Sequence, residues 1–132
     1  MTGTNFDQTV RTMLDGRNFA TVATVGPGGA PHSSVVWVER EGDTVLFSTT
    51  AGRQKARNLT RDPRVSVSLF DLENPYSSVE IRGTAELITD EDRLLPHRLS
   101  HKYLGEDPPL AEPDEIRLIV RVTPTKILRF AA

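Results

Sequence analysis

The stretch TVLFSTTAGRQKARNLTRDPRVSVSLF, residues 44–70, places two runs of strand-forming residues on either side of a short polar segment. The outer runs are rich in Val, Thr, Leu and Phe, which favour β-strands. Residues 52–61 contain helix formers instead, and this helix is expected to end near Pro63, because proline disfavours the helical conformation in the residue before it. The stretch therefore predicts a strand, a short helix and a second strand.

Strand-rich patterns continue on both sides of this stretch. Residues 18–25 and 31–41 predict two strands joined by the turn sequence GPGG, in which proline and glycine suit successive turn positions. The clearest alternation comes later, where polar and charged side chains separate the apolar positions Val79, Ile81, Ala85 and Leu87. This pattern places one face of a strand on a core and the other in water. Residues 116–130 predict a final strand, interrupted at Pro124.

Only two further helices are expected. Residues 6–16 predict a short amphipathic helix with four apolar side chains on one side: Phe6, Val10, Met13 and Leu14. A second helix follows Asp90, a good capping residue, and its apolar positions recur every four residues: Leu95, Leu99 and Tyr103. Pro96 requires this helix either to kink or to start late. Six or so strands with few helices indicate a mainly antiparallel β-sheet or barrel in a single domain, residues 1–132.

The bulk composition excludes several classes of function. The chain has no cysteine, which excludes disulfides, thiolate metal ligands and cysteine nucleophiles. Its net charge of −2 offers no general attraction to nucleic acid or to an acidic membrane, and no apolar stretch has membrane-spanning or signal-peptide character. We therefore expect a cytoplasmic protein. A chain of 132 residues buries only about two thirds of its unfolded surface, so pairing with a second copy would add stability.

Few residues suggest catalysis by side chains alone. His97 and His101 have the spacing at which one helix face can hold a metal, but neither an HExxH pattern nor a third ligand accompanies them. We interpret them as a polar helix face and expect no metal site. No G-x-S-x-G sequence supports a nucleophilic serine. If the protein is an enzyme, a cofactor carries its chemistry, and the sequence assigns no catalytic residue.

The polar segment between the two strands predicted in residues 44–70 is suited to binding an anion. Thr49 and Thr50 supply hydroxyl groups, Gly52 permits close backbone approach, and the first amides of the following helix are unpaired. Arg53 and Lys55 can bind phosphate oxygens, but they lie about 200° apart on a continuous helix. They converge only if the helix begins after Arg53. The alternative is an ordinary solvated basic helix.

The order of the motifs resembles a known superfamily. The chain contains, in succession, GPGGAPHSSVVWV, VLFSTTAGRQKARNLTRDPRVSVSLFD, NPYSSVEIRGTAEL and HKYLGEDPP. These motifs resemble the pyridoxamine 5′-phosphate oxidase-like split β-barrel superfamily, and within it the flavin/deazaflavin oxidoreductases of subgroup B, a group of coenzyme F420-dependent enzymes. The likeness extends from about residue 6 to residue 130, and GRQKARNLTRDPRVS is its most specific part.

The resemblance implies a mainly β fold, a six-stranded antiparallel split β-barrel with short helices, similar to FMN-binding proteins. It also implies a homodimer with each cofactor at the subunit interface. Five residues would bind the cofactor phosphate: Thr49, Thr50, Arg53, Lys55 and, in support, Asn58. Four residues of the second strand would lie along the ring system: Ser34, Val35, Val36 and Trp37. The partner subunit would contribute a loop that carries Asn74, Pro75 and Tyr76.

Several positions leave alternatives open. Trp37 either covers a face of the cofactor ring or fills the core. Ser77 and Ser78 stand where relatives carry a large basic or aromatic pair, which alters the contacts expected from the partner subunit. Three arginines are candidates for binding the polyglutamate tail of F420: Arg57, Arg61 and Arg64. For Arg61 and Arg64 the alternative is an ordinary surface charge.

By this resemblance the chain is an oxidoreductase that transfers a hydride between reduced F420 and a small conjugated organic substrate. FMN is the alternative cofactor, because both molecules present a phosphate to the same residues. Gln54 stands where FMN-dependent oxidases often keep a basic residue, which favours F420. A non-catalytic F420- or flavin-binding protein is a further alternative. Nucleic-acid binding is disfavoured by the negative net charge and by the lack of an accompanying aromatic platform.

Overall fold

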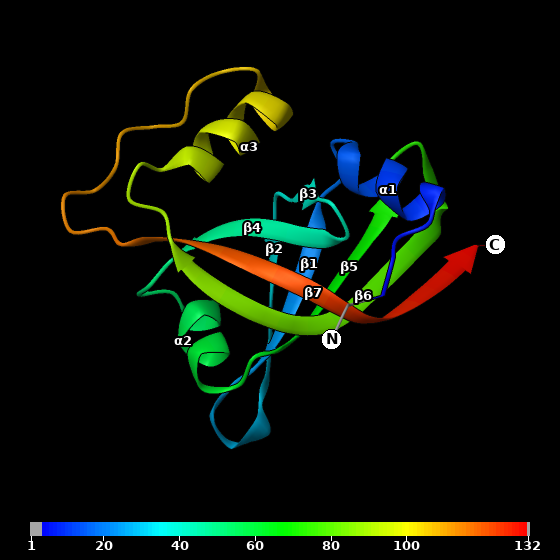
Figure 1. The fold of residues 1–132 in the computed structure, drawn as a ribbon, viewed down its shortest axis with the longest axis horizontal. Coiled ribbons are helices and arrows are strands. Elements are labelled where there is room, and N and C mark those ends of the chain that lie inside the picture. Colours follow the sequence, from blue (N-terminus) through cyan, green and yellow to red (C-terminus); the bar gives the residue numbers. More distant parts are fainter. Residues whose placement is uncertain (1–3, 132) are drawn as a thin grey trace.

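The structure is a computed structural model that describes residues 4–131; residues 1–3 and 132 of the expected domain lie outside the described residues. Its mainly β architecture confirms the expected fold class. Figure 1 labels the elements, which are α1 (Gln8–Asp15), β1 (Ala20–Val25), a 3₁₀ turn (Pro27–Gly29), β2 (Pro31–Val36), β3 (Glu39–Glu41), β4 (Thr44–Thr50), α2 (Gln54–Arg61), β5 (Arg64–Asp71), β6 (Asn74–Thr89), α3 (Leu94–Leu104) and β7 (Arg117–Ala131).

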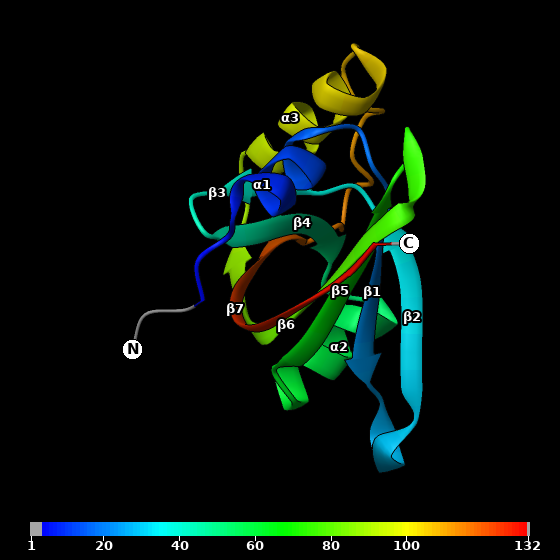
Figure 2. The same ribbon diagram turned by 90° about the vertical axis from the view of Figure 1, so that its right-hand side faces the viewer.

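The strands of the described part of the chain form one antiparallel sheet in the order β2-β1-β5-β6-β7-β4-β3. Figure 2 shows the sheet curving round, so that β4 and β7 lie opposite β1 and β5, with α1 and α3 towards one end and α2 towards the other. The sheet surrounds the main core, whose fully buried side chains include Val22, Phe47, Val67, Ile81 and Val120. The alternating strands thus bury one face each, as their pattern predicts.

The expected second strand, residues 31–41, is in fact two strands at opposite edges of the sheet, which raises the strand number from six to seven. Trp37 and Val38 carry the chain between these edges. The backbone of Val38 bonds to α3 instead of to a strand: its N–H donates to Tyr103 Oη at 3.1 Å, and its carbonyl accepts from Lys102 Nζ at 2.7 Å. Lys102 and Tyr103 lie far from Val38 in sequence, so the apolar residues 35–38 do not indicate that the strand ends there.

β6 and β7 pair along most of their length, and β7 is one strand that continues through Pro124. The expected interruption appears only as an irregular pairing: Arg82 pairs with Lys126 and Gly83 with Pro124, so Thr125 is skipped. A Cβ atom on Gly83 would overlap the carbonyl oxygen of Thr123, so only glycine permits this close approach. β6 also begins earlier than expected, because the predicted loop residues Asn74, Pro75 and Tyr76 belong to the strand.

α3 starts late, at Leu94, which is one of the two solutions that Pro96 allows. Pro96 then lies in the first helical turn, where a backbone N–H would have no intrahelical partner. Asp90 still caps the helix: its two carboxylate oxygens accept from the N–H groups of Leu94 and Leu95, each at 3.0 Å. Arg93, just before the helix, has a φ of 56° and is the one non-glycine residue with positive φ in residues 4–131.

α1 and α2 follow their sequence patterns closely. The predicted apolar side of α1 is buried: Phe6, Val10, Met13 and Leu14. α2 begins at Gln54, and Arg53 precedes it with extended backbone angles (φ −77°, ψ 152°). Each helix found in residues 4–131 is too short or too polar to cross a lipid bilayer.

Candidate functional site

A pocket of about 390 Å³ lies between β2, the end of β4, the start of α2, and α3 with the loop that follows it. It is lined by six of the residues predicted to bind a cofactor: Val35, Val36, Trp37, Thr49, Arg53 and Lys55. The other lining residues come from β4, α3, the loop after α3 and the start of β7: Ser48, Arg93, Pro96, Leu99, Pro108, Pro109, Leu110, Glu112, Glu115 and Arg117.

Three of the five predicted phosphate-binding residues line this pocket: Thr49, Arg53 and Lys55. Because α2 begins at Gln54, Arg53 lies outside the helix, and its side chain lines the same pocket as that of Lys55. A helix that begins after Arg53 is what the sequence analysis required for Arg53 and Lys55 to converge. Among the ion pairs of residues 4–131, none involves Arg53 or Lys55. Both cations are therefore available to an anion from outside the chain.

Thr49 and Lys55 leave polar groups free for a ligand. Lys55 is only 7% exposed as a residue, and burial, together with the nearby charge of Arg53, lowers the pKa of its ammonium group. Thr49 is 1% exposed, and its Oγ1 has no hydrogen-bond partner within the described residues. A buried hydroxyl without a partner costs free energy, and a cation without a counter-ion attracts an anion. A bound phosphate would satisfy both groups, so these residues fit the phosphate of a flavin-type cofactor.

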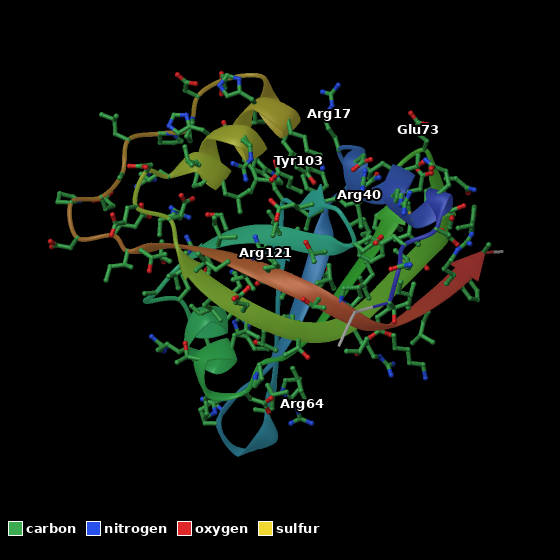
Figure 3. The ribbon with its side chains drawn as sticks, viewed as in Figure 1. Arg17, Arg40, Arg64, Glu73, Tyr103 and Arg121 are labelled. Carbon is green, nitrogen blue, oxygen red and sulfur yellow. The ribbon has the colours of Figure 1, made fainter. Side chains whose placement is uncertain are left out.

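Trp37 lies between the pocket and the core, so both alternatives for it stay open. It lines the pocket, and its ring also stacks on that of Tyr103, with centroids 5.1 Å apart and planes 8° from parallel. Tyr103 lies between α3 and the strands (Figure 3), in a second hydrophobic cluster with Leu46, Leu95 and Leu99. Its hydroxyl donates to the carbonyl of Asn18 at 2.7 Å and accepts from the N–H of Val38. Burial raises the pKa of Tyr103, so the phenol stays protonated and keeps its hydrogen bond to Asn18.

Four predicted cofactor residues do not line the pocket. Ser34 alternates with Val35 along β2, and its Oγ is buried without a partner within residues 4–131. Thr50 borders a neighbouring hollow next to residues 112–116. Tyr76 is 70% exposed at the start of β6. Within one chain the fold therefore keeps these side chains apart from the pocket.

Asn58, the fourth of them, holds α2 in place. It is fully buried, and both ends of its amide are used. Its Oδ1 accepts from Gln54 Nε2 at 2.7 Å, and its Nδ2 donates to Thr24 Oγ1 on β1 at 3.0 Å. Asn58 thus fixes the helix that presents Lys55, rather than facing the pocket itself.

The three arginines proposed for a polyglutamate tail also lie outside the pocket lining. Arg57 donates to a backbone carbonyl at the start of α2, at 2.8 Å, and Arg61 donates to the carbonyl of Val25 at 2.6 Å. Arg64 pairs with Asp62 at 2.7 Å and lowers the pKa of that carboxyl group to about 2. Figure 3 shows Arg64 beside the β1–β2 hairpin, at the opposite end of the molecule from α3.

Sequence reasoning missed a charged triad in the pocket wall. The Glu115 carboxylate bridges two guanidinium groups: its Oε2 accepts from Arg93 Nη1 at 2.5 Å, and its Oε1 accepts from Arg117 Nη2 at 2.7 Å. Burial lowers the pKa of Arg117; Glu115 opposes this effect, and the charges of Arg93 and Arg53 add to it. Glu115 and Arg117 are neighbours at the start of the last strand, but no sequence pattern connects them to Arg93, which lies 22 residues before Glu115.

The paired histidines of α3 contact a single carboxylate. Asp107 Oδ1 lies 2.6 Å from His101 Nε2 and 3.8 Å from His97 Nδ1. In the part of the chain that the structure describes, no group of three or more His, Cys, Asp or Glu side chains could hold a metal ion. The histidines connect α3 to the loop that follows it and stay outside the pocket lining.

Known proteins resemble this chain in sequence and fold. The profile of the pyridoxamine 5′-phosphate oxidase family matches residues 6–130. A solved F420 reductase is 30% identical and has a TM-score of 0.80, with 89% of this chain and 94% of that chain covered. A conserved hypothetical protein from Mycobacterium tuberculosis has a TM-score of 0.78 over 98% of this chain and 86% of its own, and at 24% identity this likeness concerns the fold alone.

A curated relative matches a shorter region. The pyridoxine/pyridoxamine 5′-phosphate oxidase of Kineococcus radiotolerans is 36% identical over 69 residues. The match covers 52% of this chain and 30% of the relative, so the chain spans less than a third of that protein's length.

Proposed function

This chain belongs to the pyridoxamine 5′-phosphate oxidase family, and from this premise we propose that it is an oxidoreductase that uses coenzyme F420 to reduce a small conjugated organic substrate. The 30% identity to a solved F420 reductase over nearly the whole chain supports this choice of cofactor. FMN is the alternative, because its phosphate would meet the same residues. The class of chemistry is inferred from the family. The site supports it with two cations, Arg53 and Lys55, which we call the phosphate cradle, next to apolar side chains of the same pocket.

The observation that carries the proposal is the pair of polar groups at the end of β4 and the start of α2. Lys55 is a largely buried residue that lines the pocket, and no ion pair of residues 4–131 involves it. Thr49 Oγ1 is a buried hydroxyl without a partner in the described chain. Arg53 adds a guanidinium whose fork suits phosphate oxygens. A solvated basic helix, the alternative reading, would leave Lys55 exposed, and Lys55 is buried.

In this proposal, the residues of the chain bind and orient the reacting molecules and exclude water from them. When bound, reduced F420 supplies a hydride to one carbon of the substrate's conjugated bond, while the other carbon takes a proton from solvent. Arg53 and Lys55 fix the phosphate, which sets the position of the ring system against Val35, Val36 and Trp37. Leu99 and Pro96 of α3 would hold the substrate over that ring and exclude water, and such orientation is a large part of rate enhancement.

We also propose that the protein is a homodimer whose second copy borders the pocket. Five large apolar side chains are exposed on the outer apolar face of the sheet: Phe19, Val35, Phe70, Leu128 and Phe130. The pairing register places Val35 and Leu128 in one cross-strand row, and Phe70 and Phe130 in the adjacent row of the same face. In these rows Thr21, Ser68 and Glu80 stand between Val35 and Leu128, and Ser78 stands between Phe70 and Phe130. Several large apolar side chains exposed on one face favour association. Val35 belongs both to this face and to the pocket lining.

Equilibrium binding of F420 and FMN tests the proposal. Each cofactor is titrated with purified protein while its fluorescence is followed, for the wild type, Lys55→Ala and Lys126→Ala. Lys126 is the matched control, because it is an exposed lysine on β7 outside the pocket lining. We expect F420 to bind more tightly than FMN, and Lys55→Ala to weaken its binding by at least about tenfold through the loss of a charge-assisted contact. Lys126→Ala should bind like the wild type.

Other outcomes select between the remaining candidates. A preference for FMN that also disappears in Lys55→Ala would replace F420 with a flavin. Tight binding of F420 without turnover of quinones, enones or linear tetrapyrroles would indicate a protein that carries the cofactor. If neither molecule binds, the proposal is wrong.

A further inference from the structure

Arg93, Glu115 and Arg117 form a second charged cluster in the pocket wall, and the phosphate cradle does not use it. We propose that Arg93 and Arg117 bind a carboxylate of the substrate, and that the carboxylate of Glu115 occupies this position in the ligand-free protein. The inference rests on the proposed function, because it assigns a substrate class to the same pocket: flat, conjugated carboxylic acids.

The geometry already accommodates a carboxylate between the two guanidinium groups. Each oxygen of Glu115 accepts one hydrogen bond, at 2.5 Å from Arg93 and at 2.7 Å from Arg117. The three side chains are between 16% and 22% exposed, so this contact is largely removed from water. Charge-assisted contacts of this kind are the strong class of hydrogen bonds, and a substrate carboxylate could make the same two.

The two arginines adjoin regular elements, whereas Glu115 lies in a loop. Arg93 directly precedes α3, and its backbone N–H donates to the carbonyl of Asp90 at 3.1 Å. Arg117 is the first residue of β7, where it pairs with Thr50 of β4. Glu115 lies in the connection between α3 and β7, outside helix and strand. Its carboxylate can therefore leave without any change in the sheet or in α3, while both cations stay in place.

Arg117 has donor capacity that Glu115 leaves unused. Its Nε is buried and has no hydrogen-bond partner within residues 4–131, and its Nη1 makes only a long contact of 3.4 Å with Ser48 Oγ. Ser48 also lines the pocket. A substrate carboxylate, free of the backbone that restrains Glu115, can approach Nε as well as Nη2 and form the forked arrangement that arginine prefers.

The charges in the pocket wall exceed what one phosphate requires. Four cations line it, Arg53, Lys55, Arg93 and Arg117, against two carboxylates, Glu112 and Glu115. The phosphate of F420 is a diester and carries a single negative charge, so a second anion is still favoured after it binds. A carboxylate of the F420 tail could supply that anion as well as a substrate, and the F420 affinity of Arg117→Met separates the two. Trp37, Leu99 and Pro109 supply apolar surface next to the arginines, which suits a flat conjugated body attached to that anion.

Binding of trans-cinnamate and of the uncharged trans-cinnamamide tests the inference without any cofactor. The two probes differ only in the charge of one group. Their affinities are measured by calorimetry and by quenching of Trp37, the one tryptophan of the chain. We expect cinnamate to bind about tenfold more tightly than the amide in the wild type and in Lys55→Ala. This preference should vanish in Arg117→Met and in Arg93→Met, and it should persist in Arg121→Met, an arginine on the same strand outside the pocket lining.

Two further measurements separate this inference from its alternatives. Glu115→Ala should tighten cinnamate binding several-fold, because it empties the position; weaker binding would mean that Glu115 only orients the arginines, and the inference would be wrong. F420 affinity should stay within about threefold of wild type in Arg117→Met. A tenfold loss would assign the arginines to the cofactor and overturn the substrate site. Failure of F420 to bind the wild type, with an intact cinnamate preference, would reject the proposed function alone.

Discussion

In the proposed function, cofactor binding depends on a single buried residue, Lys55. Its ammonium lies in the pocket wall without a carboxylate partner, and its burial, with the charge of Arg53 beside it, lowers the pKa of that group. An ammonium is charged below its pKa and neutral above it, so Lys55 loses its charge at a lower pH than an exposed lysine does. A bound anion favours the charged form and raises the pKa again.

Cofactor affinity should therefore fall as the pH rises through the lowered pKa of Lys55. We expect this alkaline loss to begin below the ordinary lysine value of 10.5 and to be absent in Lys55→Arg, because a guanidinium stays protonated throughout. The measurement is the dissociation constant of F420 from about pH 7 to about pH 10. Since F420 itself titrates, the two proteins are compared at each pH, and parallel curves for them would contradict the prediction.

At the scale of elements, the pairing of β6 with β7 depends on one glycine. At the register shift, a Cβ on Gly83 would overlap the carbonyl oxygen of Thr123 and lie 3.1 Å from the Cα of Pro124. Both neighbours are backbone atoms, so neither can move aside as a flexible side chain could. The two long strands hold the pocket residue Arg117 and the outer apolar face together, so strain at this point affects both.

Gly83→Ala should lower the free energy of unfolding by about 2 kcal/mol or more, because a forced backbone shift is as costly as overpacking a core. Chemical denaturation gives this quantity. Gly52→Ala is the control: a Cβ there meets open space, so we expect a change within about 0.5 kcal/mol. Equal free energies of unfolding for Gly83→Ala and the wild type would contradict the prediction, because β6 and β7 would then move apart at this point without loss of stability.

At the scale of the whole molecule, we expect the exposed apolar residues on the outer face of the sheet to decide the oligomeric state. Light scattering should give the wild type twice the chain mass of 14.6 kDa. Phe130→Asp should give a folded monomer, because a charge on this face opposes burial against a second copy. Leu104→Asp alters an exposed leucine at the end of α3 instead and should stay dimeric. A wild type that is monomeric at every concentration would contradict the proposed dimer.

Local patterns in the sequence predict much of this fold. The alternation from Val79 to Leu87, the turn at GPGG and the helix before Pro63 each depend on neighbouring residues, and the structure confirms them. The same holds for α1, whose apolar side is fixed by the helical repeat. The break of the second strand at Val38 could not be predicted in this way, because its cause is hydrogen bonding to Lys102 and Tyr103 of a helix far along the chain.

The sequence by itself determined the strand content, the absence of thiol chemistry and the placement of basic residues at the start of α2. Spacing alone left the phosphate cradle undecided, because convergence of Arg53 and Lys55 required a helix start that no pattern specifies. Tertiary structure decided that start, buried Lys55, and brought Arg93 next to Glu115 and Arg117. The physical reason is that burial and pairing of charges depend on contacts across the fold, whereas periodicity depends only on neighbours along the chain.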